Sequence, residues 1–269
     1  MRLPLYQIDA FTGEVFAGNP AAVCPLDGGP SEGWPDDRLL QAIAAENNLS
    51  ETAFIVPWAG NDADFELRWF TPGLEVRLCG HATLATGHVL LSRNPSIDKV
   101  RFMTRRAGPL EVTRDGDAYR LTLPAWDVVP KPLPDYVPAI GGTPIETHWR
   151  EGGYAILLYA SAAEVEQLSP DFRALRPFGD IMFIATAPGT ETDVVSRVFV
   201  PGADVDEDPV TGSAHCLLTT FWAKRLGRNS FTAYQASQRG GHLGCHLEGD
   251  RAVLSGRCVT LIEGAFHLA

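Results

Sequence analysis

The sequence predicts an α/β protein built from two similar halves. The phrase "RWFTPGLEVRLCGHA", which starts at Arg68, returns as "RVFVPGADVDEDPVTGSA" from Arg197, at an offset of 129 residues (197 − 68 = 129). Short β-rich segments precede each copy, and a helix that is apolar nearly all round follows each copy. Because the offset is close to half of the chain, these observations point to duplication of an ancestral domain.

The repeat keeps its register over a long stretch without a gap. Further matches are Glu51/Asp180, Phe54/Phe183, Ile55/Ile184, Gly60/Gly189, Asp64/Asp193, Phe70/Phe199, Pro72/Pro201, Gly73/Gly202 and Val76/Val205. The alternative is two unrelated strand–turn–helix units that share turn chemistry, and the length of the register makes that the weaker interpretation. The same ungapped register places Asp208 where the first copy has Cys79.

The first half starts with an amphipathic helix predicted over 35–48, with Leu39, Leu40 and Ile43 on one face and Asp36 or Asp37 near its start. Strands are predicted at "TAFIVP" and "DFELRWF", before the Pro-Gly turn. The helix "GHATLATGHVLL" follows this turn. Its lack of a polar face predicts that it is buried inside its own sheet.

The second half repeats this order. Ser161 and Glu164 form a predicted capping box at the start of "SAAEVEQL", and strands are predicted at "IMFIATA" and "DVVSRVF". The buried helix is "GSAHCLLTTFWAKRLG", with Gly227 as its predicted C-terminal cap. Short strands broken by glycine are predicted after Phe231.

The predicted domain organisation has four segments. The first domain covers 1–122 and the second covers 139–256, and the last strand, 257–269, is a candidate to return to the first domain. The proline-rich segment 123–138 is predicted to be the linker, because proline is disfavoured inside central strands and helices.

Composition excludes several classes of protein. The chain of 269 residues carries 22 basic and 33 acidic residues, and no basic patch interleaved with aromatic residues predicts nucleic-acid binding. The five cysteines are scattered without a C-x-x-C pair, so neither a disulfide framework nor a metal site is predicted. No apolar run is long enough to span a bilayer, and the N-terminus does not read as a signal peptide. We therefore expect a cytoplasmic protein with reduced thiols, no metal and no membrane partner.

The two helix starts are candidate anion sites. The first N–H groups of a helix lack partners within it, the helix dipole adds positive charge, and Gly80 and Gly212 allow a ligand close to the backbone. Two such starts related by a pseudo-twofold axis could hold one small anionic molecule between them. For one copy alone, helix entry would explain the glycine, and the repetition in register favours a function.

Titratable residues near these starts are candidates for acid–base chemistry. Asp208 qualifies if it is partly buried, and His81 has an intrinsic pKa near neutrality. Cys79 is ambiguous, because a lone cysteine beside an apolar helix is most often a small buried residue. Glu51 lies where an apolar strand begins, which desolvates a carboxylate, although a solvated turn residue is the commoner reading. Gly18 and Asn19 form a turn whose amide could bind a carboxylate.

The segments "DAFTGEVFAGNPAAV", "NLSETAFI", "WFTPGLEVRLCGHATLATGHVL" and "DEDPVTGSAHC" resemble the PhzF-type phenazine-biosynthesis isomerase family. This resemblance covers essentially the whole chain and implies the diaminopimelate epimerase-like fold. In that fold, each of two domains wraps a mostly antiparallel, barrel-like sheet around a central helix. The resemblance also implies no cofactor, and often a homodimer.

The resemblance assigns roles to particular residues. It implies that Glu51 is the proton-shuttling group and that His81, Asp208 and Ser213 complete the site, and we expect Gly18, Asn19, Gly80, Gly212, Ser213 and Cys79 to bind the substrate. The predicted function is a proton-shifting isomerase that acts on a small carboxylate-bearing substrate. Two alternatives stay open: a racemase or epimerase that uses Cys79 opposite Asp208 or Glu51, and a non-catalytic binder of small anions.

Overall fold

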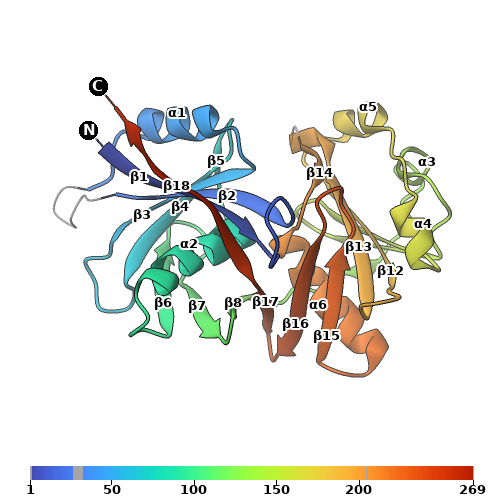
Figure 1. The fold of residues 1–269 in the computed structure, drawn as a ribbon. Helices are drawn as coiled ribbons and strands as arrows, with labels where there is room; N and C mark the ends of the chain where they lie inside the picture. The colour runs from blue at the N-terminus through green and yellow to red at the C-terminus, as the bar shows by residue number, and fades with distance from the viewer. Residues whose placement is uncertain (1, 27–32, 204, 269) are drawn as a thin grey trace. The chain divides into compact units, whose positions relative to one another are not determined.

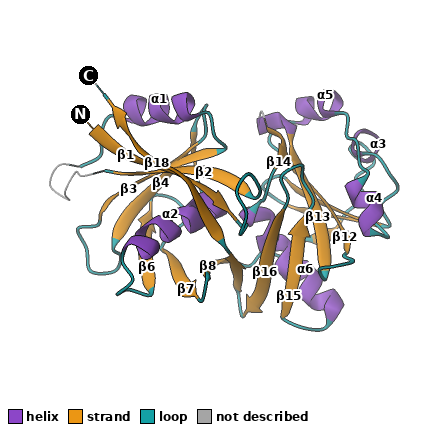
Figure 2. Cartoon of the chain, in the orientation of Figure 1, coloured by secondary structure: helices purple, strands orange, loops and turns teal. Residues whose placement is uncertain are grey.

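A computed structural model describes residues 2–26, 33–203 and 205–268 of the chain. The chain forms two compact units (Figure 1), one made of 1–123 and 255–269 and the other made of 124–254. Each unit combines a curved sheet with helices (Figure 2), which confirms the predicted α/β class.

The first unit is a mostly antiparallel sheet. Its strands are β1 (Arg2–Ala10), β2 (Asn19–Pro25), β3 (Glu51–Pro57), β4 (Phe65–Phe70), β5 (Glu75–Val76), β6 (Lys99–Thr104), β7 (Leu110–Asp115), β8 (Ala118–Pro124) and β18 (Cys258–His267). The order β18-β1-β2-β3-β4-β6-β7-β8 is antiparallel except at β2–β3 and β4–β6, which are parallel, and β5 forms a short antiparallel addition to β4.

The second unit repeats this pairing. Its strands are β9 (Val129–Pro130), β10 (Glu146–Arg150), β11 (Tyr154–Leu158), β12 (Met182–Pro188), β13 (Val194–Val200), β14 (Val205–Asp208), β15 (Ser230–Gln235), β16 (Gly241–Glu248) and β17 (Arg251–Gly256). The parallel pairs β11–β12 and β13–β15 correspond to β2–β3 and β4–β6, and β14 lies on β13 as β5 lies on β4. The duplication predicted from the repeated phrase is therefore present in the hydrogen-bonding pattern of both sheets.

Each sheet curves around one long buried helix. In α2 (Gly80–Arg93), 10 of the 14 residues are buried, and in α6 (Gly212–Leu226) 11 of the 15 are buried, as expected for helices that are apolar nearly all round. Helix α2 contacts β1, β2, β3, β6, β7 and β18 of its own unit. The remaining helices are α1 (Asp37–Asn47), α3 (Val137–Ile140), α4 (Ala162–Glu166) and α5 (Phe172–Leu175), with 3₁₀ turns at Arg176–Phe178 and Pro201–Ala203.

The predicted helix caps are confirmed. The Asp36 side chain accepts a hydrogen bond from Arg38 N at the start of α1. The Ser161 hydroxyl accepts one from Glu164 N at the start of α4 and also donates to the Glu164 carboxylate. Gly227 ends α6 in the left-handed conformation, with φ 65°.

The proline-rich segment 123–138 is more than a linker. Its strand β9 pairs with β10, and Leu133 lies in the buried core of the second unit. Proline is compatible with this position because β9 is a two-residue strand whose residues are exposed. The C-terminal segment forms β18, which pairs with β1 from Arg2↔His267 to Ala10↔Cys258.

Within the ranges that the structure describes, no helix combines the length and the apolar character needed to cross a membrane.

Candidate functional site

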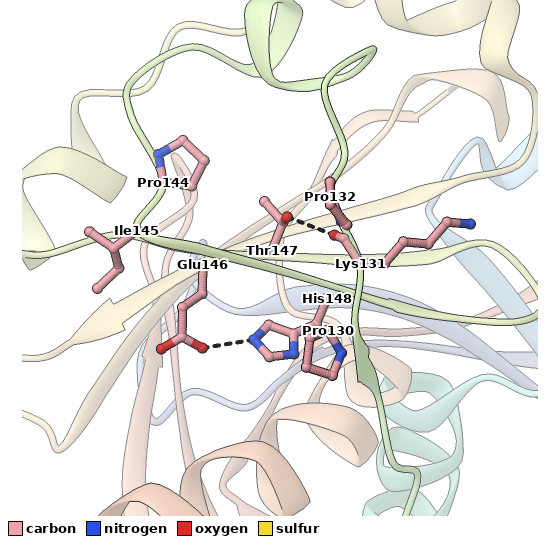
Figure 3. Close-up of a pocket in the computed structure, with 8 residues that line it drawn as sticks. All are labelled: Pro130, Lys131, Pro132, Pro144, Ile145, Glu146, Thr147 and His148. Atoms are coloured by element: carbon pink, nitrogen blue, oxygen red, sulfur yellow. Dashed lines mark hydrogen bonds and ion pairs between the residues drawn. The ribbon is translucent and has the colours of Figure 1, made fainter.

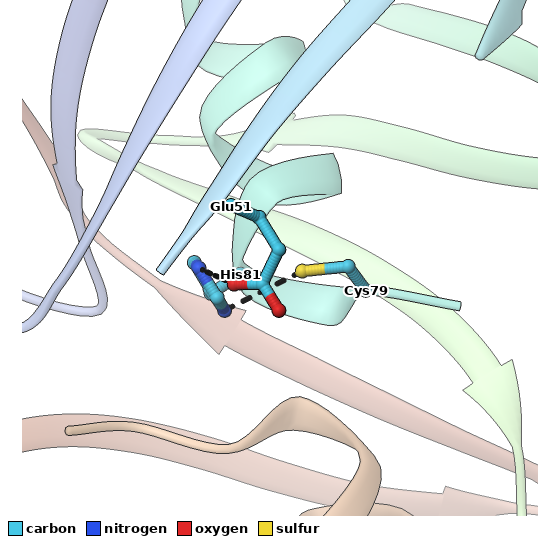
Figure 4. Close-up of side chains that lie close together, drawn as sticks. All are labelled: Glu51, Cys79 and His81. Carbon is cyan, nitrogen blue, oxygen red and sulfur yellow. Dashed lines mark hydrogen bonds and ion pairs between the residues drawn. The ribbon is translucent and has the colours of Figure 1, made fainter. Parts of the chain in front are cut away.

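Three side chains meet at the start of α2 (Figure 4). Glu51 is the first residue of β3, Cys79 is the N-cap of α2, and His81 is the second residue of that helix. The His81 Nε2 lies 3.0 Å from Glu51 Oε2, and the His81 Nδ1 lies 3.5 Å from Cys79 Sγ. Sequence reasoning placed all three in the site, and the fold brings them into direct contact.

Asn19 holds the other side of the imidazole. It is the first residue of β2, which runs parallel to β3 with Ala21 opposite Glu51, and its Nδ2 lies 3.2 Å from His81 Nδ1. A half-turn of the amide would exchange its donor for its acceptor, so Asn19 can meet Nδ1 in either protonation state of the ring. We therefore infer that Asn19 contributes by orienting His81.

A glycine is required just before Asn19. Gly18 has a φ of 64°, and a Cβ atom built there would lie 2.2 Å from the carbonyl oxygen of Ala10. Any side chain would therefore move the turn that delivers Asn19 to His81. This structural demand on Gly18 is separate from its predicted role in binding the substrate, which stays a prediction.

Burial and charge act in opposite directions on the imidazole. Burial alone would lower the pKa of His81, but the adjoining Cys79 and Glu51 side chains outweigh it and hold this pKa well above its usual range. Burial raises the pKa of Cys79 to about 11, with a further contribution from the charge of Glu51. Because the thiol is then neutral at pH 7, we assign the stabilisation of the His81 cation to the Glu51 carboxylate.

This assignment predicts a pH-dependent stability. A group whose pKa is raised by folding contributes fully below its unfolded pKa, which is about 6.5 for histidine, and the contribution is lost as the pH rises through the folded value. The loss in free energy of unfolding caused by His81→Gln should therefore be largest near pH 6 and should shrink as the pH rises above 6.5. Urea denaturation of both proteins between pH 6 and 9 measures this difference.

His88 is a matched control on the same helix. Burial lowers the pKa of His88, so its contribution to the free energy of unfolding should have the opposite pH dependence. This contribution should be present above about pH 6.5 and lost as the pH falls. A His81→Gln loss that stays constant or grows with pH would contradict a raised His81 pKa.

The second unit places a different set of groups at the start of α6. Asp208 ends β14 and is half-buried, and its Oδ2 accepts a hydrogen bond of 2.6 Å from the hydroxyl of Thr211, the N-cap. Gly212 opens the helix, and the half-buried Ser213 follows, with its Oγ 3.9 Å from the sulfur of Met182. The predicted residues Asp208, Gly212 and Ser213 thus gather at one helix start, as Glu51, Cys79 and His81 do in the first unit.

The two helix starts correct the ungapped register. Cys79 and Thr211 are both N-caps, and Gly80 and Gly212 both open their helices, an offset of 132 instead of 129 (212 − 80 = 132). The change reflects three additional residues between the Pro-Gly turn and the acidic residue that pairs with the repeated arginine. Asp208 is therefore not the structural counterpart of Cys79, which makes Thr211 its equivalent and Ser213 the equivalent of His81.

Both helix starts keep the features of an anion site. Neither Cys79 nor Thr211 makes a side-chain capping hydrogen bond, and neither first turn contains an acidic residue. The N–H groups of these turns and the positive end of each helix dipole are therefore suited to a carboxylate.

Among the described residues, one group has donor atoms that could together hold a metal ion: Glu51, Cys79 and His81. These donor atoms all lie within 4.8 Å of one another. Burial raises the pKa of the Cys79 thiol to about 11. The contacts of His81 with both Glu51 and Cys79 suit proton transfer between neighbouring groups.

The second unit also has a pocket that is lined by residues other than those predicted for the site (Figure 3). It is lined by Pro130, Lys131, Pro132, Pro144, Ile145, Glu146, Thr147 and His148. Its polar side chains bond to one another and to the backbone, with His148 Nε2 2.9 Å from Glu146 Oε2 and the Thr147 hydroxyl donating to the carbonyl of Lys131. None of the predicted site residues lines this pocket.

Two units with the same strand pairing, each curved around a buried helix whose start carries polar groups, define the diaminopimelate epimerase-like fold. The chain belongs to the PhzC-PhzF family of phenazine biosynthesis-like proteins, whose model matches residues 8–264.

Comparison with individual proteins agrees with this assignment. A protein from Pseudomonas aeruginosa called an uncharacterized isomerase is 44% identical over 269 residues, with 100% of both chains covered. The crystal structure of a PhzF-family phenazine biosynthesis protein from Enterococcus faecalis superposes with a TM-score of 0.89 at 40% identity, again covering 100% of both chains. A probable proline racemase from Agrobacterium radiobacter shares the fold at 14% identity, with a TM-score of 0.66 over 99% of this chain and 93% of that chain.

Proposed function

We propose that this protein is an isomerase that moves a proton on a small carboxylate-bearing substrate by acid–base catalysis, without a cofactor. The contact that carries the proposal is the 3.0 Å pair between Glu51 and His81. A carboxylate and an imidazole in direct contact can pass a proton between them, and the pair stands beside a helix start suited to a carboxylate. The similarity to a protein named as an isomerase supports the same class of reaction.

In the proposed mechanism, Glu51 removes a proton from a carbon that an adjacent unsaturated or carboxylate group activates. The His81 cation stabilises the Glu51 carboxylate before the transfer, and its own side chain is fixed by Asn19 and by the start of α2. The proton then returns to another carbon of the same substrate, from Glu51 or from an acid formed by His81 or Asp208. No atom is gained or lost in this sequence. In each unit the N–H groups at the helix start, Gly80 in α2 and Gly212 with Ser213 in α6, are proposed as carboxylate-binding groups.

The burial of Cys79 and its raised pKa favour Glu51 over Cys79 as the base. A thiol acts as a base only as its thiolate, and burial raises the pKa of Cys79 to about 11. Cys79 instead packs against His81, with 5% of its surface exposed. A two-base racemase built on Cys79 would need a different protonation state of this buried group.

Proton exchange with solvent tests the proposal and separates it from simple binding. We expect the protein to introduce deuterium from D2O into 2,3-dihydro-3-hydroxybenzoate, whose C2–H bonds are next to the alkene carbon that carries the carboxylate, and not into L-alanine. Loss of the C–H signal in ¹H NMR spectra measures this exchange. Tight binding of the dihydro acid without exchange would indicate a binding protein, and exchange into L-alanine alone would indicate a racemase; either result would overturn the proposal.

A further inference from the structure

Gln235 is a buried polar residue that the sequence did not single out. It is the last residue of β15, none of its surface is exposed, and its side chain reaches the loop that connects Asp208 to α6. Its Oε1 accepts from Thr211 N at 2.9 Å, and its Nε2 donates to the Asp208 carbonyl at 2.7 Å and to Thr211 Oγ1 at 3.1 Å.

The backbone partners fix the orientation of the amide. A backbone N–H can only donate and a backbone carbonyl can only accept, so Oε1 must face Thr211 N and Nε2 must face the carbonyl of Asp208. The Nε2 group therefore donates to the Thr211 hydroxyl as well. The single proton of that hydroxyl is then directed to its remaining partner, the Oδ2 atom of Asp208 at 2.6 Å.

A second side chain from the same segment supports this loop. The Ser237 hydroxyl donates to the carbonyl of Pro209 at 2.8 Å and accepts from Gly240 N at 3.0 Å. The loop from Asp208 to Thr211 is thus attached to the end of β15 at several points, which limits the movement of the Asp208 carboxylate and of the first turn of α6.

The first unit lacks this arrangement. In the strand pairing, Thr104 lies opposite Leu67 as Gln235 lies opposite Ser196, so Thr104 is the counterpart of Gln235. Its hydroxyl bonds within its own turn, donating to the carbonyl of Gly108 at 2.8 Å and accepting from Ala107 N at 2.9 Å. The duplicated halves have therefore diverged: the first carries a titratable imidazole at its helix start, and the second carries a hydrogen-bonded clamp.

We propose that Gln235 is a positioning residue that orients the Thr211 hydroxyl toward Asp208 and so holds Asp208 and the start of α6 in the geometry that the reaction needs. This inference rests on the proposed function for its catalytic consequence, while its structural part can be measured without any substrate.

The experiment compares variants of the full chain by deuterium exchange into 2,3-dihydro-3-hydroxybenzoate. Gln235→Met keeps the size of the side chain and removes all three hydrogen bonds, and we expect its turnover rate to fall about 10-fold to 100-fold while KM changes by less than about 3-fold. Thr211→Val should have a similar effect, and Thr211→Ser, which restores the hydroxyl, should stay within about 3-fold of the original rate. The double variant Gln235→Met/Thr211→Val should be no slower than the slower single variant, because both changes break one network.

Thr104→Val is the matched control, since it removes a buried hydrogen-bonded hydroxyl at the equivalent position of the other unit, and it should keep the exchange rate. Without substrate, Gln235→Met should raise the hydrogen-exchange rate of the Thr211 amide at least about 10-fold, because this N–H loses its partner.

Three results would each overturn the inference: a folded Gln235→Met protein with the original turnover, an unchanged exchange rate of the Thr211 amide, or fully multiplicative effects in the double variant. If Gln235→Met does not fold, the contrast between Thr211→Val and Thr211→Ser decides, and equal rates for these two would overturn it. An active Glu51→Gln protein would instead overturn the proposed function and leave the amide measurement valid.

Discussion

Replacing Glu51 by Gln is expected to slow deuterium exchange into 2,3-dihydro-3-hydroxybenzoate by about two to four orders of magnitude, the usual contribution of a positioned general base. The substitution keeps the size of the side chain at the start of β3 and removes the group that accepts the proton. It also removes the negative charge that supports the His81 cation at 3.0 Å. Initial rates at saturating substrate measure the effect, and we expect the affinity for the acid to change much less.

Glu66→Gln provides the control for this prediction. Glu66 lies in β4 of the same unit, its side chain is 21% exposed compared with 18% for Glu51, and it lies 3.7 Å from Arg105 instead of a histidine. This variant should retain the exchange rate of the original protein. If Glu51→Gln exchanged the acid within about 3-fold of the original rate, where a lost general base costs about 100-fold or more, Glu51 would not be the base.

The fold class could be predicted because it rests on periodicity and repetition. The register of Phe54, Phe70 and their partners Phe183 and Phe199 survives because these residues lie in buried strands where a shift would expose the core. The burial of the two apolar helices could be predicted because neither of them has a polar face. The hydrophobic pattern and the repeated register are local features of the sequence. Both sheets accordingly show the same series of parallel and antiparallel strand pairs.

The pairing of Cys79 with Asp208 was wrong because the ungapped register was continued past a change in length. Three extra residues in the second copy fall in a connection, where length changes cost little. Beyond them the matches Glu75/Glu207, Gly80/Gly212 and Ala82/Ala214 follow an offset of 132. The structure identifies the change in length through the arginines: Arg68 holds Glu75 and Arg197 holds Glu207, each through two hydrogen bonds of 2.7–2.9 Å. These side-chain contacts therefore support the offset of 132 between the two helix starts, which the ungapped comparison at an offset of 129 missed.

Gln235 escaped prediction for a related reason. It is the fifth residue of the predicted strand "FTAYQAS", on the same face as Phe231 and Ala233, but glutamine is a residue type that is mostly exposed in proteins. Its partners, Asp208 and Thr211, precede it by 27 and 24 residues, and only the parallel pairing of β13 with β15 brings them together. Glu51 and His81 could be named as candidates because both residues stand at the boundary of an apolar element, and the family resemblance implied that they share a site.

Replacing Arg68 by Met is expected to lower the free energy of unfolding by about 3 kcal/mol or more, the range for breaking a buried ion pair. The Arg68 side chain is 1% exposed and forms ion pairs at 2.8 Å with both Asp37 and Glu75. Its guanidinium also lies 4.9 Å from the ring centres of Trp34 and Phe70. Met fills part of this volume but leaves the carboxylate of Glu75, 22% exposed, with only the more distant Arg105 at 3.8 Å. Urea denaturation monitored by tryptophan fluorescence measures the change.

The double variant Arg68→Met/Glu75→Met separates charge from packing. If the loss arises mainly from the carboxylate left without its partner, removing Glu75 as well should recover at least about 1 kcal/mol, because apolar residues often replace a buried ion pair at little cost. Arg101→Met makes the same change at a pair that is 3.8 Å apart and about 40% exposed, and it should cost less than about 1 kcal/mol. A double variant less stable than Arg68→Met would show that the unpaired carboxylate is not the main source of the loss and that Glu75 stabilises the fold through other contacts, such as Arg105 at 3.8 Å. Because β5 carries Glu75 and leads directly to Cys79 and His81, that result would make Glu75 itself a structural support of the start of α2.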